Sequence, residues 1–306
     1  MKPLWREQDI PDLSGRVAIV TGANSGIGYE TARVLARHGM RVVMACRNLE
    51  RAVRARSSIL EENPHADVDF MECDTSSHTL IRKFASQFRN RYPRLDLLVN
   101  NAGIMMAHDH PPELGYEVQF GVNHLGHFLL TGLLLDVLAG TPDSRVLSLY
   151  SIAYILAMAQ IRRATGQPKR PYSSLGAYSR SKLVNLIFAV ELERRLKAHN
   201  YAVESFAVHP GITVTKLIGH FNSRFYDTAV RPVLLSLGQD VTAGTLSILR
   251  AATDRSLSGK DIIGPDGFLG IRGNPVAVSP LRRALLPKWG NRLWETSQRL
   301  SGIRYL

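Results

Sequence analysis

Cysteine is scarce in this chain of 306 residues, which contains only Cys46 and Cys73. Two cysteines are too few for a disulfide framework, and their spacing is not that of a metal site. We therefore expect no metal centre, and nothing indicates an oxidising compartment.

Long hydrophobic runs are also missing. The two most apolar stretches, 128–140 and 149–161, are shorter than the about 18–20 residues that cross a bilayer, and the first contains Asp136. Residues 1–16 are polar and lack the apolar core of a secretory signal. The sequence therefore predicts a cytoplasmic protein without a transmembrane segment.

Charge of one sign never gathers into a solid block. The formal net charge is +12, but the basic residues are spread over 33–56, 162–170 and 272–304 and are not interleaved with aromatic residues. We expect no nucleic-acid partner. A basic, well-solvated surface accounts for the excess, and the alternatives are peripheral contact with acidic lipid headgroups or with an acidic carrier protein.

What the sequence does contain is a regular alternation of short apolar runs with amphipathic stretches. The runs predict strands at 16–22, 41–47, 67–74, 95–103, 145–151 and 201–208. The amphipathic stretches predict helices at 29–39, 51–63, 77–92, 114–139 and 175–199. Because such alternation builds right-handed βαβ units, we predict an α/β fold: a single doubly wound, Rossmann-type parallel sheet with helices on both faces.

We predict one domain over residues 1–306. Its cofactor-binding and catalytic core spans 14–215, and its C-terminal tail, 265–306, is expected to vary with substrate. Two stretches interrupt the alternation. Residues 152–174 begin apolar and end basic, and 212–237 contain Phe and Tyr residues that suit a substrate lid.

The first predicted strand runs into TGANSGIG (21–28), which opens a helix. Gly22, Gly26 and Gly28 allow a tight turn and a close approach of the backbone to a pyrophosphate, and the helix N-terminus offers free N–H groups. The intervening Asn24, Ser25 and Ile27 join this predicted nucleotide site. Glycines that serve packing alone are the plainer interpretation, but three in eight residues favour a nucleotide.

The second predicted strand ends in Cys46 and Arg47, without a carboxylate. An acidic residue here bonds the ribose 2′-OH of NAD, whereas an arginine accommodates a 2′-phosphate. We therefore predict NADP(H) in preference to NAD(H), although Arg47 could merely solvate the strand end. Asp74 follows the third strand, where it could accept from the adenine amino group or cap the next helix.

With these features, the chain resembles the short-chain dehydrogenase/reductase family, in particular its retinol-dehydrogenase-like branch. The motifs that carry the resemblance are TGANSGIG (21–28), ACR (45–47), Asp74, NNAG (100–103), VNHLGHF (122–128), Ser151, YSRSK (178–182) and HPG (209–211), in that order. They cover about residues 14–215. Near Ser151 the chain departs from the family's Asn-x-Ser-Ser pattern, since Ser148 and Tyr150 replace its first two members.

Tyr178 and Lys182 lie four residues apart and so share one face of a helix. Reducing a carbonyl with hydride leaves an alkoxide that needs a proton, and a phenol can supply it. A neighbouring ammonium stabilises the phenolate and should lower the phenol pKa. The resemblance implies that Lys182 does this and also bonds the nicotinamide ribose; a solvated helix face is the plainer alternative.

Two further residues complete the predicted catalytic set. Ser151 would polarise the substrate carbonyl, with Ser148 as the fallback donor. The resemblance makes Asn123 the fourth member, holding a water that links Lys182 to solvent; a core Asn bonded to a backbone carbonyl is the alternative.

The resemblance also implies cofactor contacts at the ends of two later strands. The residues concerned are Asn100, Asn101, Ala102, Gly103, Pro210, Gly211 and Thr215, in addition to Tyr178 and Lys182. The neighbouring His124, His127 and His209 lack metal-ligand spacing and are interpreted as structural.

The function predicted from the sequence is an NADP(H)-dependent oxidoreductase that transfers hydride between nicotinamide and a hydrophobic carbonyl or alcohol. The alternative is a non-catalytic NADP(H)-binding sensor or scaffold. A dehydratase or epimerase of the same family is disfavoured by the short C-terminal tail. Homo-oligomers are usual among such relatives, so the resemblance implies a homo-oligomer as one option.

Overall fold

The computed structural model describes residues 4–105, 116–159, 172–213 and 238–306. The strands are β1 (Val17–Thr21), β2 (Arg41–Cys46), β3 (Val68–Glu72), β4 (Leu97–Asn100), β5 (Arg145–Leu149), β6 (Glu204–Val208), β7 (Ile262–Pro265) and β8 (Pro275–Ala277). The main helices are α1 (Gly26–Arg37), α2 (Leu49–Glu62), α3 (His78–Arg91), α5 (Gly126–Ala139), α7 (Ser174–Ala198), α9 (Val241–Thr253) and α10 (Pro287–Ser301). Shorter pieces are η1 (Glu7–Asp9), α4 (Val118–Phe120), the π-helical η2 (Gly121–Leu125), α6 (Tyr154–Ala157), η6 (Phe268–Gly270) and η7 (Arg282–Leu285).

The eight strands form one sheet in the order β3-β2-β1-β4-β5-β6-β7-β8. Neighbouring strands are parallel except for β8, which pairs antiparallel with β7 through Ile263–Ala277, Gly264–Val276 and Pro265–Pro275. The predicted doubly wound sheet is confirmed. The antiparallel edge strand was not foreseen, because a three-residue strand that begins with proline has no periodicity to read.

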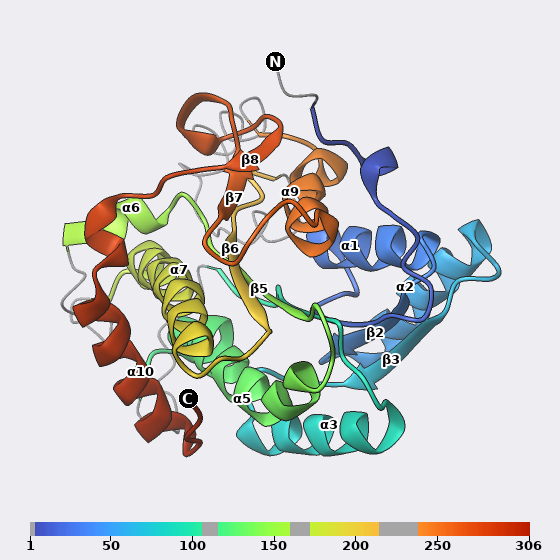
Figure 1. The fold of residues 1–306 in the computed structure, drawn as a ribbon, viewed down its shortest axis with the longest axis horizontal. Helices are drawn as coiled ribbons and strands as arrows, with labels where there is room; N and C mark the ends of the chain where they lie inside the picture. Colours follow the sequence, from blue (N-terminus) through green and yellow to red (C-terminus); the bar gives the residue numbers. More distant parts are fainter. Residues whose placement is uncertain (1–3, 106–115, 160–171, 214–237) are drawn as a thin grey trace.

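Helices cover both faces of the sheet (Figure 1). Successive side chains of a strand point to opposite faces of the sheet, so alternate residues join two different apolar clusters. Val17 and Ile19 join a cluster with α3, α5, α7 and α10, while Ala18 and Val20 join one with α1, α2 and α9. The carboxyl ends of the strands, and the loops that follow them, are thereby held by a packed core on each face of the sheet.

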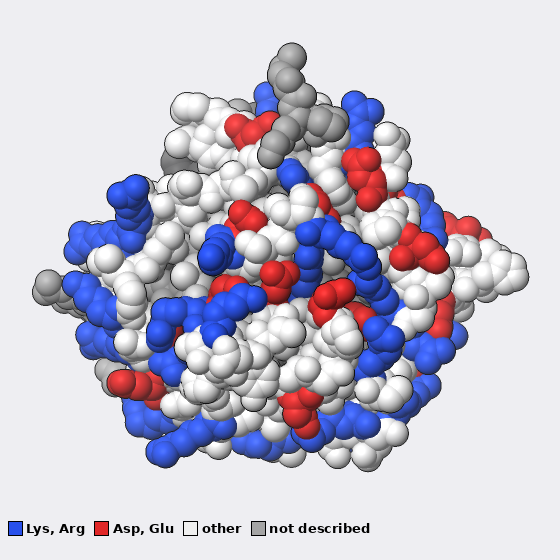
Figure 2. Space-filling model, in the orientation of Figure 1, with Lys and Arg blue, Asp and Glu red and all other residues white. Residues whose placement is uncertain are grey.

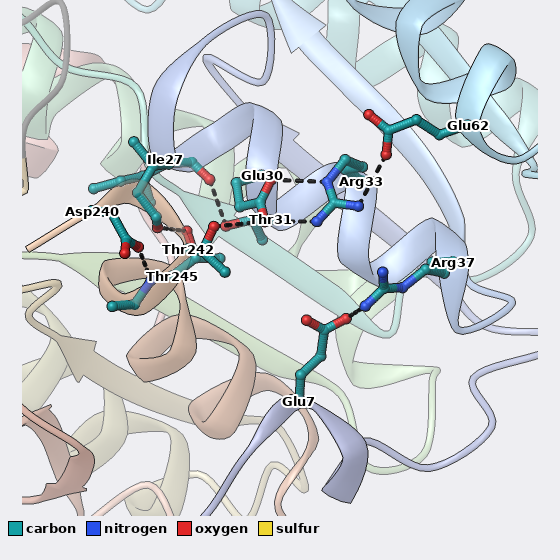
Figure 3. Close-up of polar contacts among 12 residues, drawn as sticks. Glu7, Ile27, Glu30, Thr31, Arg33, Arg37, Glu62, Asp240, Thr242 and Thr245 are labelled. Carbon is teal, nitrogen blue, oxygen red and sulfur yellow. Dashed lines mark hydrogen bonds and ion pairs between the residues drawn. The ribbon is translucent and has the colours of Figure 1, made fainter.

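Helix α1, which begins in the glycine turn, is fastened to three other elements (Figure 3). The guanidinium of Arg33 donates two hydrogen bonds to Glu30, at 2.9 and 2.8 Å, and a third to Glu62 at the end of α2, at 3.1 Å. Thr242 of α9 donates weakly to Glu30 at 3.5 Å, and Glu7 of η1 pairs with Arg37. These contacts fix the helix whose N-terminus faces the predicted nucleotide.

The segment Val118–Ala139 is the one stretch among the described residues that is long and apolar enough to cross a membrane, yet 67% of its most apolar window is buried. Helix α10 explains much of that burial. Its Trp294 packs edge-on against Phe128 with ring centroids 5.0 Å apart, and Tyr305 donates a 3.1 Å hydrogen bond to the Phe128 carbonyl. The stretch therefore packs as a core helix of the fold, and the tail expected to be variable contributes to the core.

Lysine and arginine are dispersed over the face shown in Figure 2, with acidic residues between them. Elsewhere in the chain, basic side chains form ion pairs such as Arg94 with Asp96 and Arg250 with Asp254. This face carries no single basic patch, in keeping with a basic and well-solvated surface.

Candidate active site

The glycine turn leaves the carboxyl end of β1 and leads into α1. Gly22 and Gly26 have φ angles of +66° and +56°, which L side chains rarely adopt. At Gly28 a Cβ would lie 2.5 Å from the Gly22 carbonyl oxygen and still closer to the Asn101 amide. Ser25 precedes the helix without capping it through its side chain. The turn is therefore a cradle with free N–H groups, which fits the pyrophosphate of a dinucleotide.

Thr21, which the sequence did not single out, ties this turn to the end of β4. Its hydroxyl oxygen accepts hydrogen bonds from the backbone N–H groups of Asn101 and Ala102, both at 2.9 Å. The Asn101 amide in turn donates to the Thr21 carbonyl at 2.7 Å. The two predicted cofactor segments are thus held side by side by one buried hydroxyl.

Arg47 and Asp74 follow β2 and β3 on the same edge of the sheet. Arg47 is exposed and forms no ion pair with any described residue. Asp74 accepts from the Ser76 N–H at 2.9 Å and from the Ser76 hydroxyl at 2.7 Å, while Ser77 caps α3. Asp74 therefore shapes the turn before α3 but is not its cap, and Arg47 has its guanidinium free for a ligand.

Helix α7 places Tyr178 and Lys182 one turn apart, and both side chains are buried. The Lys182 ammonium donates to the Leu149 carbonyl at the end of β5, at 3.3 Å, and lies 5.7 Å from the centroid of the Tyr178 ring. Asn185 donates to the same carbonyl at 2.9 Å. The end of β5 is thereby fixed against α7, which is where Ser151 must meet the phenol.

Burial governs the electrostatics of this pair. Desolvation lowers the pKa of Lys182 to about 8 and raises the pKa of Tyr178 to about 12, while the nearby Ser151 hydroxyl opposes the rise. The sequence led us to expect a lowered phenol pKa. The shift has the opposite sign, because burial penalises the phenolate more than Ser151 favours it.

Asn123 lies in the π-helical segment between α4 and α5, fully buried. Its amide nitrogen donates to the Ile104 carbonyl and to the Ser181 hydroxyl, both at 2.9 Å, and its Oδ1 accepts from the Ile104 N–H at 2.7 Å. Asn123 thus makes the bond to a backbone carbonyl that the core interpretation expects, and its role in holding a water stays a prediction. A Cβ on Gly103 would lie 3.2 Å from Asn123 Oδ1 and 3.7 Å from the Lys182 nitrogen, so these groups converge at Gly103.

His127 links the two halves of the site, a link that the sequence did not reveal. Its Nδ1 lies 3.1 Å from the Asn123 carbonyl, which can only accept, so Nδ1 carries the proton there. Nε2 then accepts from the Thr21 hydroxyl at 2.9 Å. Burial lowers the pKa of His127 to about 4, so the ring is neutral and keeps this arrangement at neutral pH.

The remaining predicted residues lie after β6. Gly211 has a φ of +73°, and a Cβ there would meet the Ile271 carbonyl at 2.6 Å. The Pro210 carbonyl accepts from Thr213 at 2.9 Å and from Gln239 at 2.8 Å. Thr215 and nearly all of the proposed lid, 212–237, lie outside the described residues. Within the described ranges, no group of His, Cys, Asp or Glu side chains could hold a metal ion.

Residues 16–224 match the family model of the short chain dehydrogenases. The chain belongs to this family. It is therefore an oxidoreductase acting on CH–OH or C=O groups with a nicotinamide cofactor, and the cradle of the glycine turn is the place in this short-chain dehydrogenase that fits the dinucleotide.

Its relatives include retinol dehydrogenase 13 of Homo sapiens, 36% identical over 297 residues, which are 95% of this chain and 86% of that protein. Retinol dehydrogenase 12 of Mus musculus is 42% identical over 205 residues, 67% of this chain and 64% of that protein. Polyprenol dehydrogenase of Homo sapiens is 38% identical over 259 residues, 83% of this chain and 77% of that protein.

Solved structures agree with the fold. An uncharacterized protein from Mycobacterium paratuberculosis has a TM-score of 0.77 and 32% identity, with 99% of this chain and 100% of that chain covered. The 3-ketoacyl-(acyl-carrier-protein) reductase of Brucella melitensis, complexed with NADH, has a TM-score of 0.61 and 22% identity, with 82% and 96% covered. The identity to retinol dehydrogenases 13 and 12, 36% and 42%, places this short-chain dehydrogenase in the retinol-dehydrogenase-like branch.

Replacing Gly28 with alanine should weaken dinucleotide binding by at least about tenfold, because the new Cβ must push the Gly22 backbone out of the cradle. Fluorescence titration with NADPH and with NADH measures the loss. Gly140→Ala is the matched control, since a Cβ there meets nothing closer than 3.4 Å. If Gly28→Ala bound both dinucleotides normally, the cradle would not be the pyrophosphate site.

Proposed function

We propose that this short-chain dehydrogenase is an NADP(H)-dependent oxidoreductase of hydrophobic carbonyl or alcohol substrates, with Tyr178 as its acid–base group. The observation that carries the proposal is the burial of Tyr178 and Lys182 together on α7, with the Ser151 hydroxyl near enough to influence the phenol and with Asn123 and Lys182 converging at Gly103. A solvated helix face would leave these side chains exposed and apart.

The chain's own residues account for the proton chemistry. The bound cofactor supplies or accepts the hydride. In carbonyl reduction Ser151 donates a hydrogen bond to the substrate oxygen and stabilises the charge that develops on it. Tyr178 donates its proton to that oxygen, and its raised pKa keeps it protonated and ready at neutral pH. The Lys182 ammonium then stabilises the phenolate that is left.

Asn123 and His127 are proposed to position this machinery. Asn123 uses its side chain on Ile104 and Ser181, so any water that it holds toward Lys182 must use its remaining hydrogen-bonding capacity. The neutral His127 ring joins the Asn123 backbone to Thr21. The glycine turn and the Asn123 segment are therefore coupled through a short chain of buried hydrogen bonds.

We also propose that the enzyme prefers NADP(H) over NAD(H). Support comes from Arg47, an exposed guanidinium that follows β2 where an NAD site would offer a carboxylate. The NADH of the Brucella melitensis reductase is a property of that protein. Here no carboxylate follows β2 within the ACRN segment, and we assign Arg47 to the 2′-phosphate.

A hydrophobic substrate is supported by the residues around Ser151 and by the relatives. Ile152 follows Ser151 directly, Ile155 and Leu156 come four and five residues after Ser151, and Leu156 is 62% exposed. Relatives named for retinol and polyprenol act on apolar alcohols. The sensor or scaffold alternative is disfavoured because Asn123, Ser151, Tyr178 and Lys182 are all present and lie together.

We propose that the enzyme is cytoplasmic. Peripheral contact with an anionic membrane surface and homo-oligomerisation are further options. Cys46 and Cys73 are buried free thiols, as reducing compartments favour. Among the described residues, the one apolar stretch of membrane-spanning length is accounted for by core packing.

Replacing Tyr178 with phenylalanine should leave cofactor binding intact and lower turnover by about 10²–10⁴-fold, because the proton donor is lost while the ring still packs. The measurement is NADPH absorbance with a panel of aldehydes and ketones of graded hydrophobicity. Tyr92→Phe is the control: it also removes a buried hydroxyl, bonded to Asp69, but far from the predicted site in sequence. Undiminished turnover in Tyr178→Phe would refute the acid–base assignment.

Carbonyl reduction should fall as pH rises through about 8, since the buried Lys182 loses its proton there while Tyr178 holds its own to about 12. Below that pH both groups carry the protons that reduction needs, so the rate should level off. Initial rates from about pH 6 to pH 10 with saturating NADPH test this. Lys83→Gln, which alters a half-exposed ammonium, should keep the same profile. A rate that stays level up to pH 10 would exclude Lys182 as the titrating group.

Exchange of Arg47 for aspartate should shift preference from NADPH toward NADH by about tenfold or more, because a phosphate-binding charge becomes a repelling one. The ratio of kcat/KM for the two cofactors is the measurement. Arg292→Asp makes the same charge change at an exposed position on α10 and should leave the ratio unchanged. If Arg47→Asp had the same ratio of kcat/KM for NADPH and NADH as wild type, the assignment of Arg47 to the 2′-phosphate would be contradicted.

A further inference from the structure

A cavity of about 460 Å³ is lined by residues that follow or end β5, β6 and β7, among them Tyr150, His209 and Pro265. Tyr150 and Ile152, which flank Ser151 in the chain, both line it. Its other walls come from Tyr154 and Ile155 of α6 and from the segments around β8 and residues 279–281. A space of this size accommodates a small organic molecule, and its lining is mainly apolar.

One polar side chain in this lining is His209, at the end of β6. It is only 3% exposed, and no hydrogen bond of normal geometry reaches either ring nitrogen from any described residue. Its neighbour is the Tyr150 ring, with centroids 5.4 Å apart. A buried imidazole without partners costs stability, so its presence against a cavity points to a partner that arrives with the ligand.

The other two buried histidines near the site behave differently. His127 bonds Thr21 and the Asn123 backbone, and His124 bonds Ser297 at 2.8 Å. His209 has only the nearby backbone groups of Gly270 and Tyr150, which favour its charged form less than burial opposes it. The balance lowers the pKa of His209 to about 4, so the ring is neutral at neutral pH and offers one donor and one acceptor nitrogen.

We propose that the cavity binds the far end of the substrate and that His209 is a specificity residue, which hydrogen-bonds a second oxygen atom on an otherwise apolar carbonyl or alcohol. This inference rests on the proposed function and deepens it. The reacting oxygen meets Ser151 and Tyr178, while the apolar body extends past Ile152 into the cavity and presents a hydroxyl or carbonyl to His209. The Tyr150 ring, packed against the imidazole, helps to hold it in place. The substrate class is thus an apolar compound with two separated oxygen functions.

The chemistry of recognition explains why one imidazole suffices. A site built to hydrogen-bond an oxygen disfavours the analogue that lacks it, because the site's polar group then stays buried and unpaired. The apolar walls supply affinity, and His209 supplies the selection. A substrate with a hydrocarbon end alone would still bind, but it would leave the imidazole without a partner.

The test compares n-alkanals of increasing chain length with the matched ω-hydroxyaldehydes, in the wild-type enzyme and in His209→Leu. At the chain length that spans the cavity, wild type should favour the hydroxyaldehyde in kcat/KM by about tenfold. His209→Leu should abolish this preference by losing activity on the hydroxyaldehyde alone. A variant that loses activity equally on both aldehydes, or a wild type that reduces both equally at every length, would overturn the proposal.

Stability separates ligand recognition from a structural role. Without ligand, the Tm of His209→Leu should equal or exceed that of wild type, since an unpaired buried polar group is removed. His124→Leu is the matched control, and it should lower Tm by stranding the buried Ser297 hydroxyl while keeping the aldehyde preference. A fall in Tm for His209→Leu as large as that of His124→Leu, with the preference intact, would make His209 structural.

A binding measurement distinguishes failure of this inference from failure of the proposed function. Thermal shift with 1,12-dodecanediol and with 1-dodecanol, in the presence of NADP⁺, requires no turnover. The diol should stabilise wild type more than the mono-alcohol does, and this difference should vanish in His209→Leu. If the diol advantage is seen without aldehyde reduction, the proposed function fails and the subsite stands; if reduction is seen with equal shifts for the two alcohols, the subsite fails.

Discussion

The hydroxyl of Thr21 is the contact on which the rest of the site depends. It accepts two backbone N–H bonds from the end of β4 and faces His127 from α5, so three elements meet at one buried oxygen. Parallel strands bring their carboxyl ends to one edge of a sheet, but they do not by themselves fix the loops that follow. Here the glycine turn, the Asn101–Gly103 segment and the Asn123 backbone share this single point of attachment, so the proposed cofactor cradle and the Asn123 segment are positioned together.

The second constraint is the burial of titratable side chains. It explains their pKa values better than their spacing in the sequence does. Lys182, Tyr178 and the buried histidines all sit where water is excluded, and in each case desolvation is the main cause of the pKa shift. The neutral form is favoured for every one of them. A site of this kind is kept at some cost in stability, and the cost is visible in polar atoms such as those of His209 that lack partners within the protein.

Much of the fold could be predicted from the residues. The β-branched runs at 16–22 and 41–47, the glycine turn and the helical period of 175–199 are local signals, and the corresponding elements are present. Helix α9 and strands β7 and β8 were missed, because the strands are short, contain proline and gain their order only by pairing with earlier strands.

The residues of the candidate site also fall into those that the sequence could predict and those that it could not. Tyr178, Lys182 and the glycines follow from spacing and chemistry, whereas Thr21, Ser181, Asn185 and the bridging bonds of His127 depend on contacts between residues far apart in the chain. The sign of the Tyr178 pKa shift was wrong for the same reason, since burial depth is not written in local sequence.

The cover that α10 provides over α5 has a consequence for how the chain folds during synthesis. Phe128 is shielded by Trp294 and Tyr305, residues that leave the ribosome long after α5 has been made. Until then an apolar helix with little amphipathic character has no partner on that side. Such contacts close large loops and form late, and exposed apolar surface in the meantime favours aggregation. The nascent chain should therefore depend on chaperones until Trp294 and Tyr305 have been made and pack on α5, because Phe128 stays uncovered on that side until then.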